Sequence, residues 1–269
     1  MSQVPTHVAS PGPVPAVPTI ELAILSRPGG RPYNEDACGH WHSDRHLCCV
    51  VADGAGGHGG GEVASRLAVS HIIERFAGTQ LRSADEVREL LLSTNETVIL
   101  HRADAPELRQ MHTTVVSLFL DLHNGEALWG HAGDSRLYLF RDGQMLERTK
   151  DHSLVQSLVE AGLLTPEQTR SHPRRSELQS ALGTDPSYLR ISTVARAWGT
   201  RSGDAFLLCT DGLWEYVDES DMAFALRQAE GPVAWLNALE AKVLQSVAAS
   251  GKSGHDNFSA IAVWARSAD

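Results

Sequence analysis

The sequence lacks the long apolar runs and the basic character that mark two large classes of protein. No uncharged stretch among its 269 residues approaches the roughly 20 apolar residues that cross a bilayer, and the N-terminus shows neither the basic start nor the apolar core of a signal peptide. The net charge is −10, which disfavours binding to nucleic acid or to an anionic membrane surface, because both need basic patches. We therefore expect a cytoplasmic protein that binds neither membrane nor nucleic acid.

Cysteine is scarce, and its four positions form no recognisable metal or disulfide pattern. The four cysteines are Cys38, Cys48, Cys49 and Cys209. They show no C-x-x-C spacing, and three of the four lie in or beside apolar runs. We expect reduced thiols buried in the core, which agrees with a reducing compartment.

Low-complexity sequence is confined to the N-terminus. Residues 1–18 contain five of the twelve prolines, which predicts a flexible or polyproline-like tail. From Ile20 onward neither a linker nor a repeat is present, and 42% of the residues are hydrophobic. Residues 19–269 are therefore predicted to form one domain with a sizeable core, and we expect a monomer.

Hydrophobic periodicity and turn signals predict grouped strands and helices. A helix follows the glycine-rich loop 54–61 and stops at Gly78, and a second begins at Ser83, where Glu86 completes a capping box. Further helices are expected within 153–182, where Thr165 starts a capped turn, and at 219–229 and 232–249. Strands are expected at 20–26, 46–52, 115–122, 127–132, 136–141, 145–148, 190–197, 205–210 and 258–264.

This order indicates an α+β fold. Residues 113–149 have the pattern of a β-meander, because Asn124-Gly125 and Asp142-Gly143 are hairpin signals. Strands and helices are grouped rather than strictly alternating, which favours antiparallel sheets packed together with helices outside and disfavours a doubly wound parallel sheet.

Four aspartates lie far apart in the chain, each beside an apolar run that is typical of a strand: Asp53, Asp134, Asp211 and Asp256. Folding could bring their carboxylates together at one edge of the sheet core. Like charges within a few Å raise one another's pKa or recruit cations, and aspartate with carbonyl and water suits Mg²⁺ or Mn²⁺ rather than zinc.

Eight short motifs occur in an order that resembles the metal-dependent protein phosphatases, the type-2C serine/threonine family, in its compact bacterial form. Each motif alone is weak, but the ordered set is specific and extends from about Ile20 to Trp264. The motifs are Arg31–Asp36, Val51–His58, Thr113–Thr114, Gly133–Arg136, Asp151–Ser153, Ala181–Gly183, Thr210–Trp214 and Asp256–Asn257.

The resemblance implies a four-layer α-β-β-α sandwich with two central antiparallel sheets and a binuclear Mn²⁺ or Mg²⁺ centre at one end. By motif, Asp53 would bridge both ions and the Gly54 carbonyl would bind the first, while Asp211 and Asp256 would complete the second. Glu35 and Asp36 would hold metal-bound waters, and Asp134 would bind a third ion. Arg31 would bind the substrate phosphate.

Such a set suits the hydrolysis of phosphate esters. Two ions can bring the pKa of a bridging water towards neutrality, so that hydroxide attacks phosphorus in line without a phosphoenzyme. A guanidinium such as that of Arg31 can pair with two phosphate oxygens. A serine or threonine leaving oxygen also needs a proton, which a general acid or a metal-bound water must supply. Many eukaryotic members of the family have histidine directly after Asp-Gly, whereas this chain has Ala55 there and His58 three residues later, so His58 is the candidate acid.

Simpler interpretations exist for each of these positions. The aspartates could be turn formers or helix caps, since Asp-Gly is ordinary turn chemistry, and Asp134 could cap a hairpin. Arg31 could be a surface residue before Pro32, Glu35 and Asp36 could cap a local turn, and His58 could be an exposed loop residue. A second departure from the family is Met111-His112, where glycine is common.

We expect an enzyme that hydrolyses phosphoserine and phosphothreonine in proteins and so reverses a bacterial serine/threonine kinase. By analogy, standalone members occur beside such kinases and forkhead-associated proteins, including in type VI secretion control. Residues 153–182 match the flap that bacterial members insert, which could gate access. Two alternatives are a catalytically silent phosphopeptide-binding scaffold on the same fold, for which a missing metal ligand would be the mark, and a small-molecule phosphohydrolase.

Overall fold

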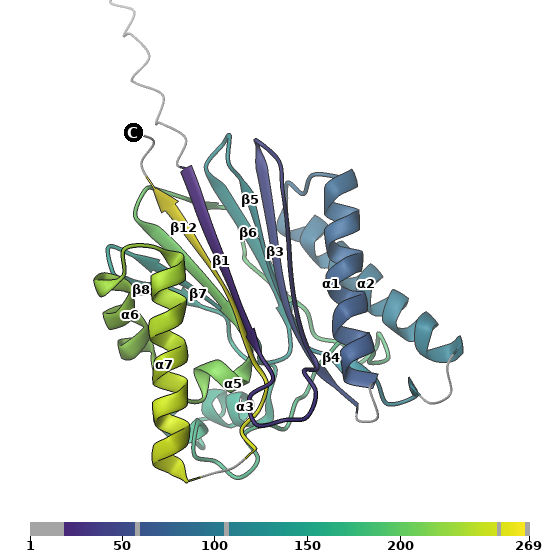
Figure 1. Cartoon of the computed structure of the whole chain (residues 1–269). Helices are drawn as coiled ribbons and strands as arrows, with labels where there is room; N and C mark the ends of the chain where they lie inside the picture. The colour runs from purple at the N-terminus through teal and green to yellow at the C-terminus, as the bar shows by residue number, and fades with distance from the viewer. Residues whose placement is uncertain (1–18, 57–59, 105–107, 252–253, 267–269) are drawn as a thin grey trace, which may run out of the picture.

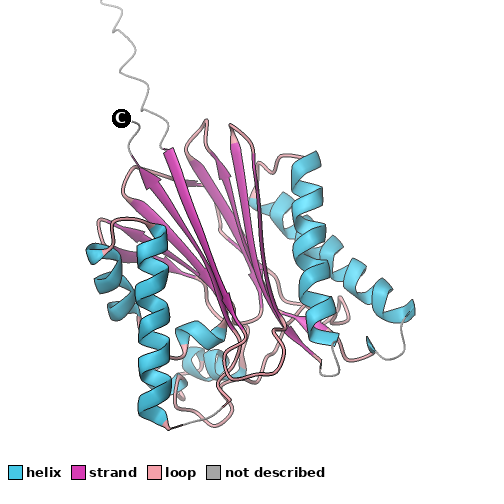
Figure 2. Ribbon diagram, viewed as in Figure 1, coloured by secondary structure: helices cyan, strands magenta, loops and turns pink. Residues whose placement is uncertain are grey.

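In the computed structural model of the chain, which describes residues 19–56, 60–104, 108–251 and 254–266, two antiparallel sheets pack face to face. Figure 2 shows the sheets at the centre with helices on both outer sides. This arrangement confirms the expected α-β-β-α layering. The proline-rich segment 1–18 lies outside the described residues.

The first sheet has five strands, in the spatial order β1-β12-β11-β7-β8. Each neighbouring pair is antiparallel, and β1 pairs with β12 along its whole length, from Thr19 opposite Arg266 to Arg27 opposite Phe258. The strands are β1 (Thr19–Arg27), β7 (Arg136–Arg141), β8 (Gln144–Arg148), β11 (Asp204–Cys209) and β12 (Phe258–Arg266).

The second sheet follows the path β10-β6-β5-β3-β2, with β9 paired to β6 and β4 paired to β3. Strand β3 lies between β5 and β2, and its residues from His46 to Ala52 are all buried. The strands are β2 (Asp36–His42), β3 (His46–Ala55), β4 (His112–Thr113), β5 (Val115–Asp121), β6 (Glu126–Ala132), β9 (Ser192–Thr193) and β10 (Trp198–Gly199).

Two long helices cover each sheet (Figure 1). Helices α1 (Gly60–Gly78) and α2 (Ala84–Asp104) pack on the seven-stranded sheet, while α6 (Glu219–Gln228) and α7 (Pro232–Ser250) pack on the five-stranded sheet. The Ser83 hydroxyl accepts the Glu86 amide hydrogen at the start of α2, which confirms the predicted N-cap. Among the described residues, no helix is long and apolar enough to cross a membrane.

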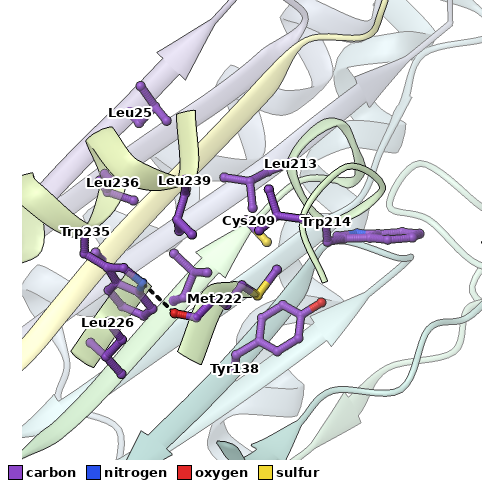
Figure 3. Packing of buried hydrophobic residues seen from close by; sticks show 14 of the residues in the cluster. Leu25, Tyr138, Cys209, Leu213, Trp214, Met222, Leu226, Trp235, Leu236 and Leu239 are labelled. Carbon is purple, nitrogen blue, oxygen red and sulfur yellow. Dashed lines mark hydrogen bonds between the residues drawn. The ribbon is translucent and has the colours of Figure 1, made fainter. Parts of the chain in front are cut away.

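The hydrophobic core has three layers, one between the sheets and one beneath each helix pair. The layer under α6 and α7 gathers around Trp235, whose indole N–H donates to the Met222 carbonyl (Figure 3). Between the sheets, aliphatic residues of both sheets interdigitate with one another and with Phe206 of the five-stranded sheet. All four cysteines are free, and Cys48, Cys49 and Cys209 are buried, as expected.

Several predicted elements were wrong in detail. Strand β2 was missed, because its sequence DACGHWH mixes polar and apolar residues. It lies at the edge of its sheet, and most of its residues are only partly buried, so no apolar run marks it. Within the predicted strand 190–197 only the two-residue β9 forms, and a second short pairing, β10, follows just after it. Helix α5 (Asp211–Trp214) was not predicted.

The segment 153–182 is less helical than predicted. Only α3 (Leu154–Glu160) and α4 (Pro166–Thr169) are helical, and Thr165 N–H donates to Gln168 Oε1 as the capping box requires. Gly162 adopts φ +71° just after α3, which ends that helix, and Pro173 disfavours helical geometry at the residue before it.

The expected meander is also interrupted. Asp142 and Gly143 adopt positive φ in the tight β7–β8 turn, as the hairpin signal predicted. Gly133-Asp134, in contrast, forms no hairpin, because β6 belongs to the seven-stranded sheet and β7 to the five-stranded sheet. The chain therefore crosses from one sheet to the other at Asp134.

Candidate metal centre

The four aspartate turns meet at one end of the sandwich, the end at which α5 and β4 lie in Figure 1. Asp53 comes from β3 and lies directly opposite Asp36 of β2 in the ladder. Asp211 begins α5 immediately after β11, and Asp256 precedes β12, so both belong to the other sheet. Asp134 stands on the crossing between the sheets.

The pKa shifts of these carboxyls indicate that they lie close enough to repel one another. The pKa of Asp53 is raised well above its usual value, first by burial and then by the charges of Asp36, Asp211, Asp134 and Asp256. Burial likewise raises the pKa of Asp211, with further contributions from Asp134, Glu215, Asp256 and Asp36. The convergence predicted from the sequence is therefore observed.

Two threonines fix Asp53 through its backbone. The Asp53 amide donates to Thr114 Oγ1 at 3.0 Å, and its carbonyl accepts from the Thr114 amide at 2.8 Å and from the Thr113 hydroxyl at 2.9 Å. The backbone amide and carbonyl of Asp53 are thereby both satisfied, which fixes the position of this residue at the end of β3. The two threonines belong to the ordered motif set, although the sequence alone assigned them no role.

Asp36 is held from the opposite sheet. The Thr210 hydroxyl donates to Asp36 Oδ2 at 3.0 Å and accepts the Ser259 amide hydrogen at 3.0 Å. Burial raises the pKa of Asp36 to about 7, even though the hydrogen bonds to Ser259 and Thr210 oppose that rise. Thr210 was missed by sequence reasoning as a functional residue; its place directly before Asp211 was the available signal.

Asn257 anchors the loop that carries Arg31. Its side-chain amide donates to the carbonyls of Pro28 and Tyr33, each at 2.8 Å, and its Oδ1 accepts the Glu35 amide hydrogen at 2.8 Å. Arg31 then reaches the site, where its Nη2 lies 3.0 Å from Asp256 Oδ2. Asn257 is a second functional residue that sequence reasoning quoted without assigning a role.

Glycine is required at two positions in the site. A Cβ on Gly54 would lie 2.0 Å from the Gly61 carbonyl oxygen, and one on Gly212 would lie 1.9 Å from the Asn257 carbonyl oxygen. Both contacts are with backbone, which cannot turn aside. The absence of side chains at these glycines lets strand and loop backbones approach closely beside Asp53 and Asp211.

The donor set fits a hard divalent cation. Asp36 Oδ1 and Asp211 Oδ1 are buried, and neither has a hydrogen-bond partner in the described part of the chain. Within those same residues, no group of three or more His, Cys, Asp or Glu side chains is placed closely enough to hold a metal ion by itself. Mg²⁺ does not need one, because it keeps several waters and binds through one or two carboxylates, and oxygen ligands also suit Mn²⁺.

The remaining predicted residues fall as follows. Glu35 lies beside the centre, with its carbonyl accepting from the Ser65 hydroxyl at 2.6 Å. His58 lies outside the described residues, so its proposed acid role stays a prediction. Trp214 is buried, and its indole N–H donates to the Asp134 carbonyl at 2.9 Å, so it packs against the site and supports the Asp134 turn.

The carboxyls make the stability of the metal-free protein depend on pH. Burial raises the pKa of Asp134 to about 7 in the folded protein, from 3.8. The folded protein favours the neutral form of this carboxyl, so the stabilisation is complete below about pH 3.8, where the carboxyl is neutral in both states. It is lost as pH rises from there through about 7. The lowered pKa values of His131 and His152 change the stability in the opposite direction as pH rises. The pH dependence of the wild-type stability alone therefore does not isolate Asp134, whereas a comparison with an Asp134 variant does.

We expect Asp134→Asn in EDTA to have nearly the wild-type melting temperature at about pH 3.5, below both pKa values, and a higher one at pH 8, because the amide stays neutral. Calorimetric melts at the two pH values measure this difference. A variant that is equally or less stable at pH 8 would show that the Asp134 charge is not costly in the folded protein.

The model of the family described as protein phosphatase 2C matches residues 30–253. The chain belongs to the protein phosphatase 2C family. It is similar to the serine/threonine phosphatase stp of Listeria innocua, with 34% identity over 203 residues, which cover 73% of this chain and 79% of that protein.

Solved structures of the family agree with the fold. The catalytic domain of the serine/threonine protein phosphatase PstP in complex with two manganese ions matches with a TM-score of 0.75 and 28% identity, covering 92% of this chain and 98% of that one. PppA, a key regulatory component of the type VI secretion system in Pseudomonas aeruginosa, matches with a TM-score of 0.72 and 29% identity, covering 93% and 99%. This protein phosphatase 2C member is a metal-dependent serine/threonine protein phosphatase that acts on phosphoproteins.

Proposed function

We propose that the enzyme holds two Mn²⁺ or Mg²⁺ ions through Asp53, the Gly54 carbonyl, Asp211 and Asp256, with Glu35 and Asp36 acting through water. Asp134 is proposed to contribute to a third, weaker site together with Asp211. The observation that carries this proposal is the convergence of carboxyls from both sheets, with raised pKa values and two carboxylate oxygens that find no partner among the described residues. The two manganese ions of the PstP catalytic domain support the choice of metal.

The chain's own residues would then orient the phosphate ester. When bound, the divalent ions supply an acidified water and offset the charge of the transition state. Arg31 is proposed to pair with two phosphate oxygens, since its guanidinium is half exposed and already lies at the rim of the site beside Asp256. The proton for the leaving oxygen is proposed to come from His58.

Arg31→Lys tests the phosphate-binding role. Lysine keeps the charge but cannot make a bidentate contact, so we expect kcat/KM for a phosphothreonine peptide to fall by about tenfold. The free energy of unfolding should hardly change, because the Arg31–Asp256 pair is exposed. Steady-state kinetics at saturating Mn²⁺ measure the effect. Unchanged kcat/KM would remove Arg31 from the phosphate site.

The proposed activity is tested by phosphate release from phosphothreonine and phosphoserine peptides with Mn²⁺, with Mg²⁺ and with EDTA. We expect turnover with either ion and none with EDTA. Competition by nucleotides measures the preference for peptides, because a small-molecule phosphohydrolase would bind the nucleotide better. Absence of turnover in a folded protein that binds Mn²⁺ would favour the phosphopeptide-binding scaffold.

The physiological setting is part of the proposal. We place the enzyme in the cytoplasm as a monomer that reverses a bacterial serine/threonine kinase, with residues 153–182 as a flap at the active site. The likeness to PppA, described as a key regulatory component of type VI secretion, supports a related setting. A forkhead-associated protein is proposed as a partner by analogy with the family. Phosphoproteomic comparison of cells with and without the enzyme identifies its substrates.

A further inference from the structure

His152 joins three segments of the chain at one point. Its backbone amide donates to the Gly133 carbonyl at 2.8 Å, and its Nδ1 accepts the Gly133 amide hydrogen at 3.3 Å. Its own carbonyl accepts from the Gln179 amide at 2.8 Å, and Nε2 lies 2.8 Å from the Ser192 hydroxyl. The start and the end of the segment 153–182 therefore meet the crossing between the two sheets at this one histidine.

The imidazole of His152 is neutral, and its tautomer follows from its contacts. Burial lowers the pKa of His152 to about 3, and the nearby rings and charges of His131 and Arg190 contribute in the same direction. The His131 ring stacks on it with the centroids 4.6 Å apart. Because Nδ1 accepts from a backbone N–H, the proton resides on Nε2, which donates to Ser192 Oγ.

Gly133 has little freedom apart from this contact. Its φ is +105°, and a Cβ there would lie 2.7 Å from Thr114 Cβ, so the turn passes tightly over the threonine that fixes Asp53. On its other side the Asp134 carbonyl accepts from the Trp214 indole. The contact with His152 Nδ1 fixes the Gly133 amide as well. This amide belongs to the peptide bond between Ala132 and Gly133, and the next peptide bond joins Gly133 to Asp134.

We propose that His152 is a positioning residue for the metal centre: its Nδ1 fixes the Gly133-Asp134 turn and so aims the Asp134 carboxylate at the other aspartates. The inference rests on the proposed function of Asp134. It also makes the turn sensitive to the segment 153–182, because a movement of Gln179 or Ser153 is transmitted through the His152 backbone to Gly133. The flap and the Asp134 site are then mechanically coupled.

Two amide substitutions separate the two ring nitrogens. In His152→Asn the side-chain oxygen can occupy the place of Nδ1 and still accept the Gly133 hydrogen, whereas in His152→Gln the longer amide reaches the place of Nε2 instead. We expect Asn to keep the wild-type Mn²⁺ affinity of the third, weaker site within about twofold, and Gln to weaken the affinity of that site by about three- to tenfold, the value of one buried hydrogen bond. Ser192→Ala, which removes only the Nε2 contact, is the matched control and should behave as wild type.

The measurement is Mn²⁺ titration by calorimetry without substrate, followed by steady-state kinetics. A positioning role predicts that His152→Gln lowers kcat at subsaturating Mn²⁺, with KM for the peptide unchanged. Equal losses in the Asn and Gln variants, or losses in neither, would overturn the inference, because simple packing does not distinguish the two nitrogens. Failure of the wild-type enzyme to bind Mn²⁺ or to turn over would instead refute the proposed function.

Amide hydrogen exchange on the wild-type protein gives a test that needs no variant to fold. The Gly133 amide should exchange slowly, because it is bonded to a buried nitrogen, and it should exchange faster in His152→Gln than in His152→Asn if those variants fold. Fast exchange of the Gly133 amide in wild type would show that the contact is not maintained and would overturn the proposal.

Discussion

Asp211→Asn should reduce the rate of phosphate release from a phosphothreonine peptide by about 10³-fold or more at saturating Mn²⁺. Asparagine has the same shape but carries no negative charge, and Asp211 has a buried Oδ1 that nothing in the described residues satisfies. Removing the charge also relieves repulsion within the cluster, so the metal-free variant should be at least as stable as wild type at pH 8. Loss of activity without loss of stability is the signature of a ligand.

The matched control is Asp142→Asn. Asp142 also precedes a glycine, but it lies in the β7–β8 turn, and its φ of +52° is one that asparagine adopts readily. We expect wild-type activity and stability for this control. Activity of Asp211→Asn close to that of Asp142→Asn would remove Asp211 from the metal centre.

Gly212→Ala should disrupt the centre without touching a ligand. The new Cβ would lie 1.9 Å from the Asn257 carbonyl oxygen, so the backbones that carry Asp211 and Asp256 must move apart. We expect a loss of about 1–3 kcal/mol in the free energy of unfolding, because overpacking against backbone cannot relax cheaply. Mn²⁺ binding should weaken as well, since the two carboxylates no longer keep their spacing.

Gly199→Ala is the control for this substitution, because a Cβ there would meet nothing within 4 Å. Chemical denaturation measures stability, and calorimetric titration measures Mn²⁺ binding. Wild-type Mn²⁺ affinity in Gly212→Ala would show that the close approach of the two backbones does not set the spacing of the carboxylates.

The central strands and the long helices could be predicted from sequence because burial imposes a strong pattern on them. Every residue of β11 is buried, and its apolar run is unmistakable. The edge strand β2 gave no such signal, since only Asp36 among its residues is fully buried. The crossing at Gly133-Asp134 could not be distinguished from a hairpin, because local turn residues do not reveal which sheet the next strand will join.

The candidate site divides in the same way. Aspartates beside apolar runs could be predicted to converge, since strand ends meet at the edges of sheets. The hydrogen bonds of Thr210, Asn257 and His152 join residues that lie 174, 222 and 19 positions apart from their partners Asp36, Glu35 and Gly133. Neither composition nor periodicity carries information about such pairs, so only the tertiary structure could identify these supporting residues.

The two sheets each contribute part of the aspartate cluster, with Asp36 and Asp53 from one side and Asp211 and Asp256 from the other. The distance between these halves is therefore set by the thickness of the apolar layer that separates the sheets, in which Leu118 and Phe206 are fully buried. A change of side-chain volume in that layer therefore changes the distance between the two pairs of aspartates, even though the substituted residue lies far from any of them. Substitutions that the fold accepts can in this way still lower activity.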